Sequence, residues 1–213
     1  MELFEAIKNR RSIRKYTDKK VPDNVLKKII DAASWAPSAT NKQDWRYIIV
    51  TDNKIKEEIV KNGAPSFIKN APVGILVLYS NLTDRLEYRD DIQSASASIQ
   101  NMLLAAYSLN LGCCWTCNIP PKKKLRKIFR IPWNYDPIAY ISAGYYEEKP
   151  RPKVREKEFK EVISYNRFDF NEKIPSRLQL KLRLRRLFKK IYYRLPMKRY
   201  IDKLAKKYEQ KFD

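Results

Sequence analysis

The sequence predicts a protein of the α+β class, because segments with helical periodicity and short strand-like segments are intermixed without a regular βαβ repeat. Its 213 residues fit one medium domain and an appendage. A hydrophobic fraction of 44% and an aromatic fraction of 12% are enough for a folded core, although 32% of the residues are charged. We therefore expect a folded chain with one main domain.

The first two helices follow from apolar spacing and from prolines. Leu3, Phe4 and Ile7 recur at helical spacing, which predicts a helix just before a basic run at residues 9–11. Pro22 opens a second helix, and Pro37 stops it. The apolar positions of this second helix are Val25, Leu26, Ile29, Ile30 and Ala33.

The remaining core elements follow from two kinds of pattern. β-Branched and aromatic residues predict strands over 45–51 and 71–79. Apolar residues at helical spacing predict a long helix over 91–109 with one broad buried face, and Gly112 is the expected cap of its C-terminus. The other expected elements are helices over 54–60 and 121–129 and strands over 113–117 and 138–144.

The composition excludes several kinds of site. The chain has no histidine, which removes the usual general base and the commonest metal ligand. Its three cysteines lie together, so a zinc or iron–sulfur site would lack a fourth ligand, and we expect reduced, buried thiols and no metal. Four isolated glycines exclude a G-x-G-x-x-G or Walker A loop, so side chains would hold any phosphate. The cysteines are Cys113, Cys114 and Cys117.

A basic cluster stands at the end of the first helix, with three guanidinium groups and a hydroxyl within five residues. An arginine fork can give a phosphate two charge-assisted hydrogen bonds, so the cluster predicts a phosphate site. The alternative is a solvated basic helix end, where arginine favours the helix dipole. The four residues are Arg10, Arg11, Ser12 and Arg14.

A polar loop over residues 36–45 joins the second helix to the first strand. Its amide side chains offer both donors and acceptors, which suits the edge of a heterocycle such as a flavin ring. The alternative is an ordinary turn, because Pro, Ser and Asn are common turn residues. The candidate residues are Pro37, Ser38, Asn41 and Gln43.

With both segments in register, the chain resembles the nitroreductase family over nearly all of residues 1–170. The R-R-S-x-R run of that family stands here at 10–14, and its P-S-x-x-N-x-Q-P-W loop at 37–45. Further similarity runs through 100–106, 109–115 and 143–145. The resemblance implies a nitroreductase-like fold with a central, mostly antiparallel sheet flanked by helices, in an intertwined homodimer.

The resemblance also implies bound FMN. The arginine cluster would hold its phosphate and ribityl chain, and the polar loop of the partner subunit would contact the flavin. Gly144 would lie against the cofactor, and Arg155 would close the phosphate site, with Arg151 and Lys153 as alternatives. The implied FMN-binding residues are Arg10, Arg11, Ser12, Arg14, Pro37, Ser38, Asn41, Gln43, Gly144 and Arg155.

The implied activity is reduction of an electron-poor acceptor, such as a nitroaromatic or a quinone, by NAD(P)H. FMN would take a hydride and pass the electrons on in a ping-pong order, and no catalytic side chain is assigned. Two departures from the family pattern bear on the substrate more than on FMN. Asp44 replaces the usual proline and adds a negative charge beside the flavin loop, and Tyr146 stands where a proline often follows G-Y.

The character of the chain changes after residue 170. Residues 171–213 hold 15 Lys and Arg against 4 Asp and Glu, a net charge of +11 out of the chain's +21. We therefore expect two parts. Residues 1–170 form the FMN-binding, nitroreductase-like domain that the resemblance implies, and residues 171–213 form a basic amphipathic helical extension. Such a helix commonly lies on anionic lipid, and the alternative is that its apolar stripe packs on the flavin domain or on the partner subunit. Its apolar positions are Leu184, Leu187, Phe188, Ile191 and Leu195.

The extension leaves a second functional hypothesis open, in which a flavin-domain relic serves as a membrane-surface or partner-binding adaptor. Nucleic acid is not expected as a partner, because no binding motif is recognisable and interleaved aromatic residues are sparse. Neither a signal peptide nor a membrane span is predicted. We expect a cytoplasmic protein, peripheral at the membrane if the extension binds lipid.

Overall fold

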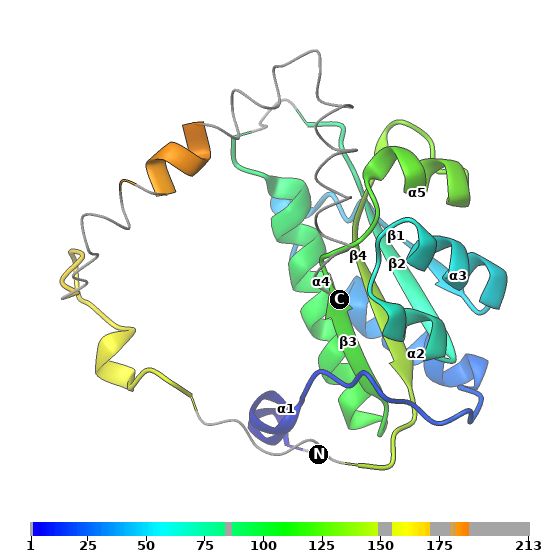
Figure 1. The fold of residues 1–213 in the computed structure, drawn as a ribbon. Helices are drawn as coiled ribbons and strands as arrows, with labels where there is room; N and C mark the ends of the chain where they lie inside the picture. The colour runs from blue at the N-terminus through cyan, green and yellow to red at the C-terminus, as the bar shows by residue number, and fades with distance from the viewer. Residues whose placement is uncertain (1, 84–86, 149–154, 171–179, 181, 188–213) are drawn as a thin grey trace. The chain divides into compact units, whose positions relative to one another are not determined.

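The computed structural model describes residues 2–83, 87–148, 155–170, 180 and 182–187 (Figure 1). The chain divides into two compact units, Met1–Lys153 and Val154–Asp213. All strands of the described residues belong to the first unit.

A four-stranded sheet forms the centre of the first unit, in the order β1-β2-β4-β3. Each neighbouring pair is antiparallel, which confirms the expected α+β fold with an antiparallel sheet. The order places β2 and β4 inside the sheet, and all eight residues of β2 are buried. The strands are β1 (Trp45–Val50), β2 (Val73–Ser80), β3 (Gly112–Thr116) and β4 (Tyr135–Gly144).

Helices cover both faces of the sheet. Successive side chains of a strand point to opposite faces, so a strand with apolar residues throughout contributes to the core on each side. Along β2, Ile75 and Val77 join the core formed with α2 and α4, whereas Leu76 and Leu78 join the core under α3 and α5. In Figure 1, α4 lies on one side of the strands and α3 and α5 on the other. The helices are α2 (Asp23–Ser34), α3 (Asn53–Lys61), α4 (Asp90–Ser108) and α5 (Lys122–Phe129), with short 3-10 turns η1 (Ala39–Asn41) and η2 (Ser66–Asn70).

The first helix, α1 (Leu3–Asn9), buries only Ala6. The apolar residues that predicted it, Leu3, Phe4 and Ile7, are 60%, 72% and 42% exposed in the single chain. The sequence therefore predicted the helix correctly, but its apolar side chains remain exposed in the single chain.

The end of α4 corrects one expectation about a glycine. Gly112 is the first residue of β3 and not a helix cap. Asn110 instead takes the left-handed conformation, with φ of 59°. The N–H of Leu111 donates to the carbonyl of Ala106 at 2.8 Å, and that of Asn110 to Tyr107 at 3.0 Å, which is the Schellman pattern.

The second unit contains the 3-10 turn η3 (Phe159–Glu161), closed by a capping box between Glu158 and Glu161. Residues 180 and 182–187 are helical and exposed. Phe188, Ile191 and Leu195 of the expected basic helix lie outside the described residues. Within the described part of the chain, no helix has the length and apolar character needed to cross a membrane.

Candidate functional site

The arginine cluster lies along the edge of the sheet. Ser12 forms an isolated parallel bridge with Cys113 of β3, and the N–H of Ile13 donates to the carbonyl of Cys113 at 2.9 Å. Ile13 is buried, so the alternation of an extended chain leaves Ser12 and Arg14 exposed on either side of it. Main-chain bonds and one buried side chain thus fix the position of the cluster.

Two glycines allow this close approach. Gly112 of β3 pairs directly with Gly144 of β4. A Cβ on Gly112 would lie 2.6 Å from Cγ1 of Ile13 and 2.7 Å from the ring of Tyr146, and a Cβ on Gly144 would lie 2.6 Å from Pro72. A larger residue at position 112 would therefore push the arginine segment away from the sheet. The pairing also brings the predicted residue Gly144 close to that segment.

Tyr16 fastens the same segment a second time. Its hydroxyl donates to the carbonyl of Ile13 at 2.5 Å and lies 3.3 Å from the carbonyl of Ser142 in β4. Burial is the main cause that raises the pKa of Tyr16, and the neighbouring thiols of Cys113 and Cys114 raise it further. Tyr16 therefore stays a neutral hydrogen-bond donor.

The three arginines differ in their surroundings. Nη1 of Arg11 donates to the carbonyls of Lys8 and Arg10 at 2.6 and 2.8 Å, so one nitrogen of Arg11 caps the C-terminus of α1. The guanidinium carbon of Arg14 lies 5.8 Å from the ring centroid of Phe67, a cation–π contact.

Arg10 and Arg11 each keep an unpaired donor at the inner end of the guanidinium group. In both residues Nε is buried and has no hydrogen-bond partner among the described residues. Burial raises the pKa of Cys113 to about 12, an effect that Cys114 increases and the positive charge of Arg10 opposes, so Arg10 lies near that thiol. A buried donor without a partner is costly, and an anionic ligand would satisfy it.

The polar loop has a strained backbone. Thr40, Asn41 and Gln43 all have left-handed conformations, with φ of 50°, 55° and 53°. For a β-branched residue such as Thr40 this conformation is an outlier. Strain of this kind persists where surrounding contacts enforce it, and it concentrates at functional sites.

Specific hydrogen bonds hold the loop in this shape. The hydroxyl of Ser38 accepts from the N–H of Gln43 at 3.0 Å, and the amide of Gln43 donates to Oδ1 of Asn41 at 2.7 Å. The hydroxyl of Ser94, in the first turns of α4, accepts from the N–H of Ala39 at 3.1 Å. Pro37, Asn41 and Gln43 remain exposed.

The two predicted groups of residues lie toward opposite ends of α4. The loop is anchored at Ser94, whereas the arginine segment is anchored at Cys113, shortly after α4 ends at Ser108. At about 1.5 Å per residue, the helix between Ser94 and Ser108 is roughly 21 Å long. The fold therefore brings Arg10, Ser12 and Gly144 together and leaves the loop apart from them within one protomer.

Arg155 is exposed and belongs to the second unit. Its alternatives, Arg151 and Lys153, lie outside the described residues.

Sequence reasoning missed the residues that position the site. Ile13 and Tyr16 have no distinctive motif. Ser94 and Ser98 carried a signal, because two small polar residues four apart interrupt the apolar face of a long helix. Both are buried, and Ser98 shares a 2.5 Å hydrogen bond with the hydroxyl of Tyr47.

The prediction of buried thiols is confirmed for Cys113 and Cys114, which are 4% and 2% exposed. It is wrong for Cys117, which is exposed because β3 ends one residue earlier, at Thr116. The described residues contain no group of three or more potential metal ligands.

The fold and site together define an α+β protein with a cluster of arginines along the edge of an antiparallel sheet. The model of the Nitroreductase family matches residues 7–64 and 56–145, which is more than half of the chain. The chain belongs to the nitroreductase family.

Individual relatives agree with this assignment. A protein of Methanothermobacter thermautotrophicus, provisionally named NADH dehydrogenase/NAD(P)H nitroreductase, is 38% identical over 154 residues, covering 70% of this chain and 80% of its own length. The NADH dehydrogenase of Thermus thermophilus is 40% identical over 185 residues, covering 70% and 89%. The solved structure of an FMN-dependent nitroreductase of Clostridium difficile is 30% identical with a TM-score of 0.66, covering 78% of this chain and all of that one.

Proposed function

We propose that this chain is an FMN-dependent oxidoreductase that uses NAD(P)H to reduce an electron-poor acceptor, such as a nitroaromatic or a quinone. Family membership and the names of its relatives support the proposal. The observation that carries it is Arg10, whose buried Nε has no partner on a segment that Ile13 fixes to the sheet.

The donors present fit the phosphate of FMN. A phosphate carries several strong acceptors and negative charge, which match guanidinium groups and a hydroxyl. Arg10, Ser12 and Arg14 would hold the phosphate and the ribityl chain, and Arg11 would contribute the nitrogens that do not cap α1. Gly144 and Arg155 are proposed to complete this side of the site.

We infer that the flavin site needs two copies of the chain. The polar loop of one protomer, with Pro37, Ser38, Asn41 and Gln43, would contact the flavin held by the arginines of its partner. The course of α4 supports this assignment, because a stretch of helix roughly 21 Å long, from Ser94 to Ser108, lies between the anchor of the loop and the start of the strand that anchors the arginines. The exposed apolar face of α1 and the 80% exposed Trp35 are typical of a subunit interface.

When bound, FMN would supply the redox chemistry, which is hydride transfer from NAD(P)H and electron transfer to the acceptor in a ping-pong order. The side chains of this protein bind the cofactor, orient it and set the charge around it. Asp44 lies near the end of the polar loop, where its negative charge would disfavour acidic acceptors.

The first test is titration of the apoprotein with FMN, followed by flavin fluorescence and absorbance. Arg10→Ala should raise the Kd for FMN about tenfold to a hundredfold, as loss of charge-assisted hydrogen bonds predicts. Arg130→Ala, an exposed arginine after α5, is the control and should leave the Kd unchanged. A wild-type protein that does not bind FMN would contradict the proposal.

The second test follows turnover. Under anaerobic conditions NADH or NADPH should bleach the flavin absorbance of the wild-type holoprotein, and addition of a quinone or nitroaromatic should restore it. A flavin that neither donor reduces would refute the enzymatic proposal while leaving FMN binding intact.

The second candidate function is an adaptor on anionic membranes, through the basic extension. Leu180, Leu184 and Leu187 recur at helical spacing on the described helical residues and are 59%, 45% and 53% exposed, among exposed arginines. Truncation after Phe170 should then reduce sedimentation with anionic vesicles and leave FMN binding unchanged. Equal sedimentation of the full and truncated chains would exclude this role.

A further inference from the structure

Helix α5 presents a cationic surface outside the cofactor site. Leu125 is fully buried and fixes the inner side of the helix. The outward cations are exposed and form no ion pair with any described residue. We call this surface the basic face of α5; it consists of Lys123, Lys124, Lys127 and Arg130, together with Trp133 in the following loop.

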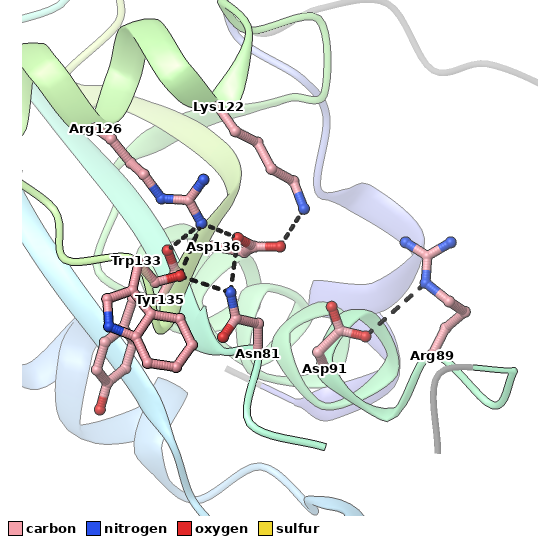
Figure 2. Close-up of polar contacts among 8 residues, drawn as sticks. All are labelled: Asn81, Arg89, Asp91, Lys122, Arg126, Trp133, Tyr135 and Asp136. Carbon is pink, nitrogen blue, oxygen red and sulfur yellow. Dashed lines mark hydrogen bonds and ion pairs between the residues drawn. The ribbon is translucent and has the colours of Figure 1, made fainter. Parts of the chain in front are cut away.

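Trp133, in the loop that follows α5, is 74% exposed. Its main chain is held firmly: Nη2 of Arg126 donates to the carbonyl of Trp133 at 3.1 Å, and Nδ2 of Asn81 donates to the same carbonyl at 2.8 Å (Figure 2). Asp136 pairs with Arg126 and Lys122, which ties the loop to α5 and β4. The main chain that carries the exposed Trp133 side chain is therefore fixed by hydrogen bonds and ion pairs.

We propose that the basic face of α5 binds the surface of an anionic lipid bilayer. An indole combines an apolar ring with one N–H donor, which suits the boundary between lipid headgroups and acyl chains. Lysine and arginine beside it would meet the negative charge of the headgroups. Charge complementarity identifies the partner, because four exposed cations lack an acidic partner within the described structure.

A single-stranded nucleic acid is the other polyanion to consider. Such ligands bind to successive aromatic side chains on which bases stack. The basic face of α5 offers one exposed indole, so it lacks that platform, and a bilayer is the better match.

This proposal is separate from FMN binding and from the basic extension, because it uses different residues. It is tested in the full-length, FMN-loaded protein with the extension intact. The measurement is cosedimentation with phosphatidylcholine vesicles with and without phosphatidylserine, at two salt concentrations. The variant Lys123→Glu/Lys124→Glu/Lys127→Glu should lower partitioning onto phosphatidylserine vesicles by about tenfold or more, and added salt should lower wild-type partitioning.

A matched variant separates this surface from the general charge of the chain. Lys20→Glu/Lys27→Glu/Lys28→Glu makes the same charge change at exposed positions in and before α2 and should change partitioning less than about twofold. Trp133→Phe should remove most of the blue shift in tryptophan fluorescence that vesicles cause. The Tm and the Kd for FMN of each variant check that the fold is intact.

Three results would overturn the proposal. The α5 variant could partition like the wild type, or both triple variants could lose partitioning equally. Alternatively, the α5 variant could lose affinity for a single-stranded oligonucleotide while its vesicle partitioning stays unchanged, which would assign the surface to nucleic acid.

Discussion

The N–H of Ile13 donates a 2.9 Å hydrogen bond to the carbonyl of Cys113. This bond runs beside a parallel bridge, whereas every pair of named strands in the sheet is antiparallel. The residues around Ile13 thus lie against the free edge of β3, between Arg10 and Arg14. The position of the proposed phosphate ligands depends on β3 as much as on their own sequence.

Gly112→Ala should disturb this arrangement directly. The new Cβ would lie 2.6 Å from the side chain of Ile13, so the arginine segment must move. We expect a loss of about 1 to 3 kcal/mol in the free energy of unfolding, as for overpacking elsewhere. The Kd for FMN should rise about tenfold, because the guanidinium groups would be displaced.

The matched control is Gly63→Ala, whose new Cβ has no atom within 4 Å but whose φ of +110° strains an alanine. It should cost about 1 kcal/mol of stability and leave the Kd for FMN unchanged. If both variants bind FMN like the wild type, the close contact of Gly112 with Ile13 does not position the site.

Ser94→Ala should loosen the polar loop from α4. It removes the acceptor of the Ala39 N–H bond, at 3.1 Å, and should cost about 1 kcal/mol in the free energy of unfolding. Because the loop is proposed to contact the partner's flavin, kcat with NAD(P)H should also fall. Steady-state kinetics and urea unfolding measure the two effects.

Ser108→Ala is the control for that prediction, since Ser108 is exposed in the last turn of the same helix. It should change neither quantity appreciably. A Ser94→Ala enzyme with wild-type kcat would argue that the anchoring of the loop is irrelevant to turnover.

Asp136→Asn should weaken the support of the Trp133 loop. Burial acts to raise the pKa of Asp136, but hydrogen bonds and charge from Lys122, Asn81 and Arg126 outweigh it and lower the pKa below 3.8. The stabilisation by the carboxylate is therefore complete above the unfolded-state pKa and is lost as pH falls through the folded-state pKa. At neutral pH the variant should lose about 2 kcal/mol.

Urea unfolding of both proteins from pH 7 down to pH 3 checks this prediction. The difference between wild type and variant should be constant above about pH 5 and should shrink in more acidic solution. Asp18→Asn, at an exposed position, should follow the wild type throughout. A difference independent of pH down to pH 3 would mean that the charge of Asp136 is not what stabilises the loop.

Lys56→Met should alter the pH dependence of stability at the alkaline end. Lys56 is 3% exposed, its Nζ donates to the carbonyl of Ala71 at 2.8 Å, and burial lowers its pKa below 10.5 although Asp52 opposes this. The unfolded chain thus holds the proton to higher pH than the folded one. Stability of the wild type relative to the variant should therefore rise as pH increases toward 10.5.

Urea midpoints at pH 7 and pH 10 measure that change. Lys54→Met, at an exposed position on the same helix, should parallel the wild type at both values. A constant difference between wild type and Lys56→Met would show that Lys56 keeps an ordinary pKa in the folded protein.

Local patterns predicted most of the fold. The apolar spacing of α4 and the continuous apolar run of β2 located these elements to within a few residues. A helix with one buried face has apolar residues at helical spacing, and a strand buried on both faces is apolar throughout. The prediction that Gly112 caps the helix is wrong. A glycine is needed there because Ile13, almost a hundred residues away in the chain, packs against it too closely for a Cβ. Cys117 was assigned to a buried strand because the end of β3 depends on its pairing with β4 and not on local composition.

The sequence by itself determined the elements, the family resemblance and the candidate ligands, because motifs and periodicities are local properties of the chain. Only the tertiary structure distinguished the three arginines: Arg10 and Arg11 each keep a buried Nε without a partner, Arg11 also bonds through Nη1 to main-chain carbonyls at the end of α1, and Arg14 stacks on Phe67. It also separated the arginine segment from the polar loop along α4. These distinctions depend on contacts between residues far apart in the chain, which no local pattern records.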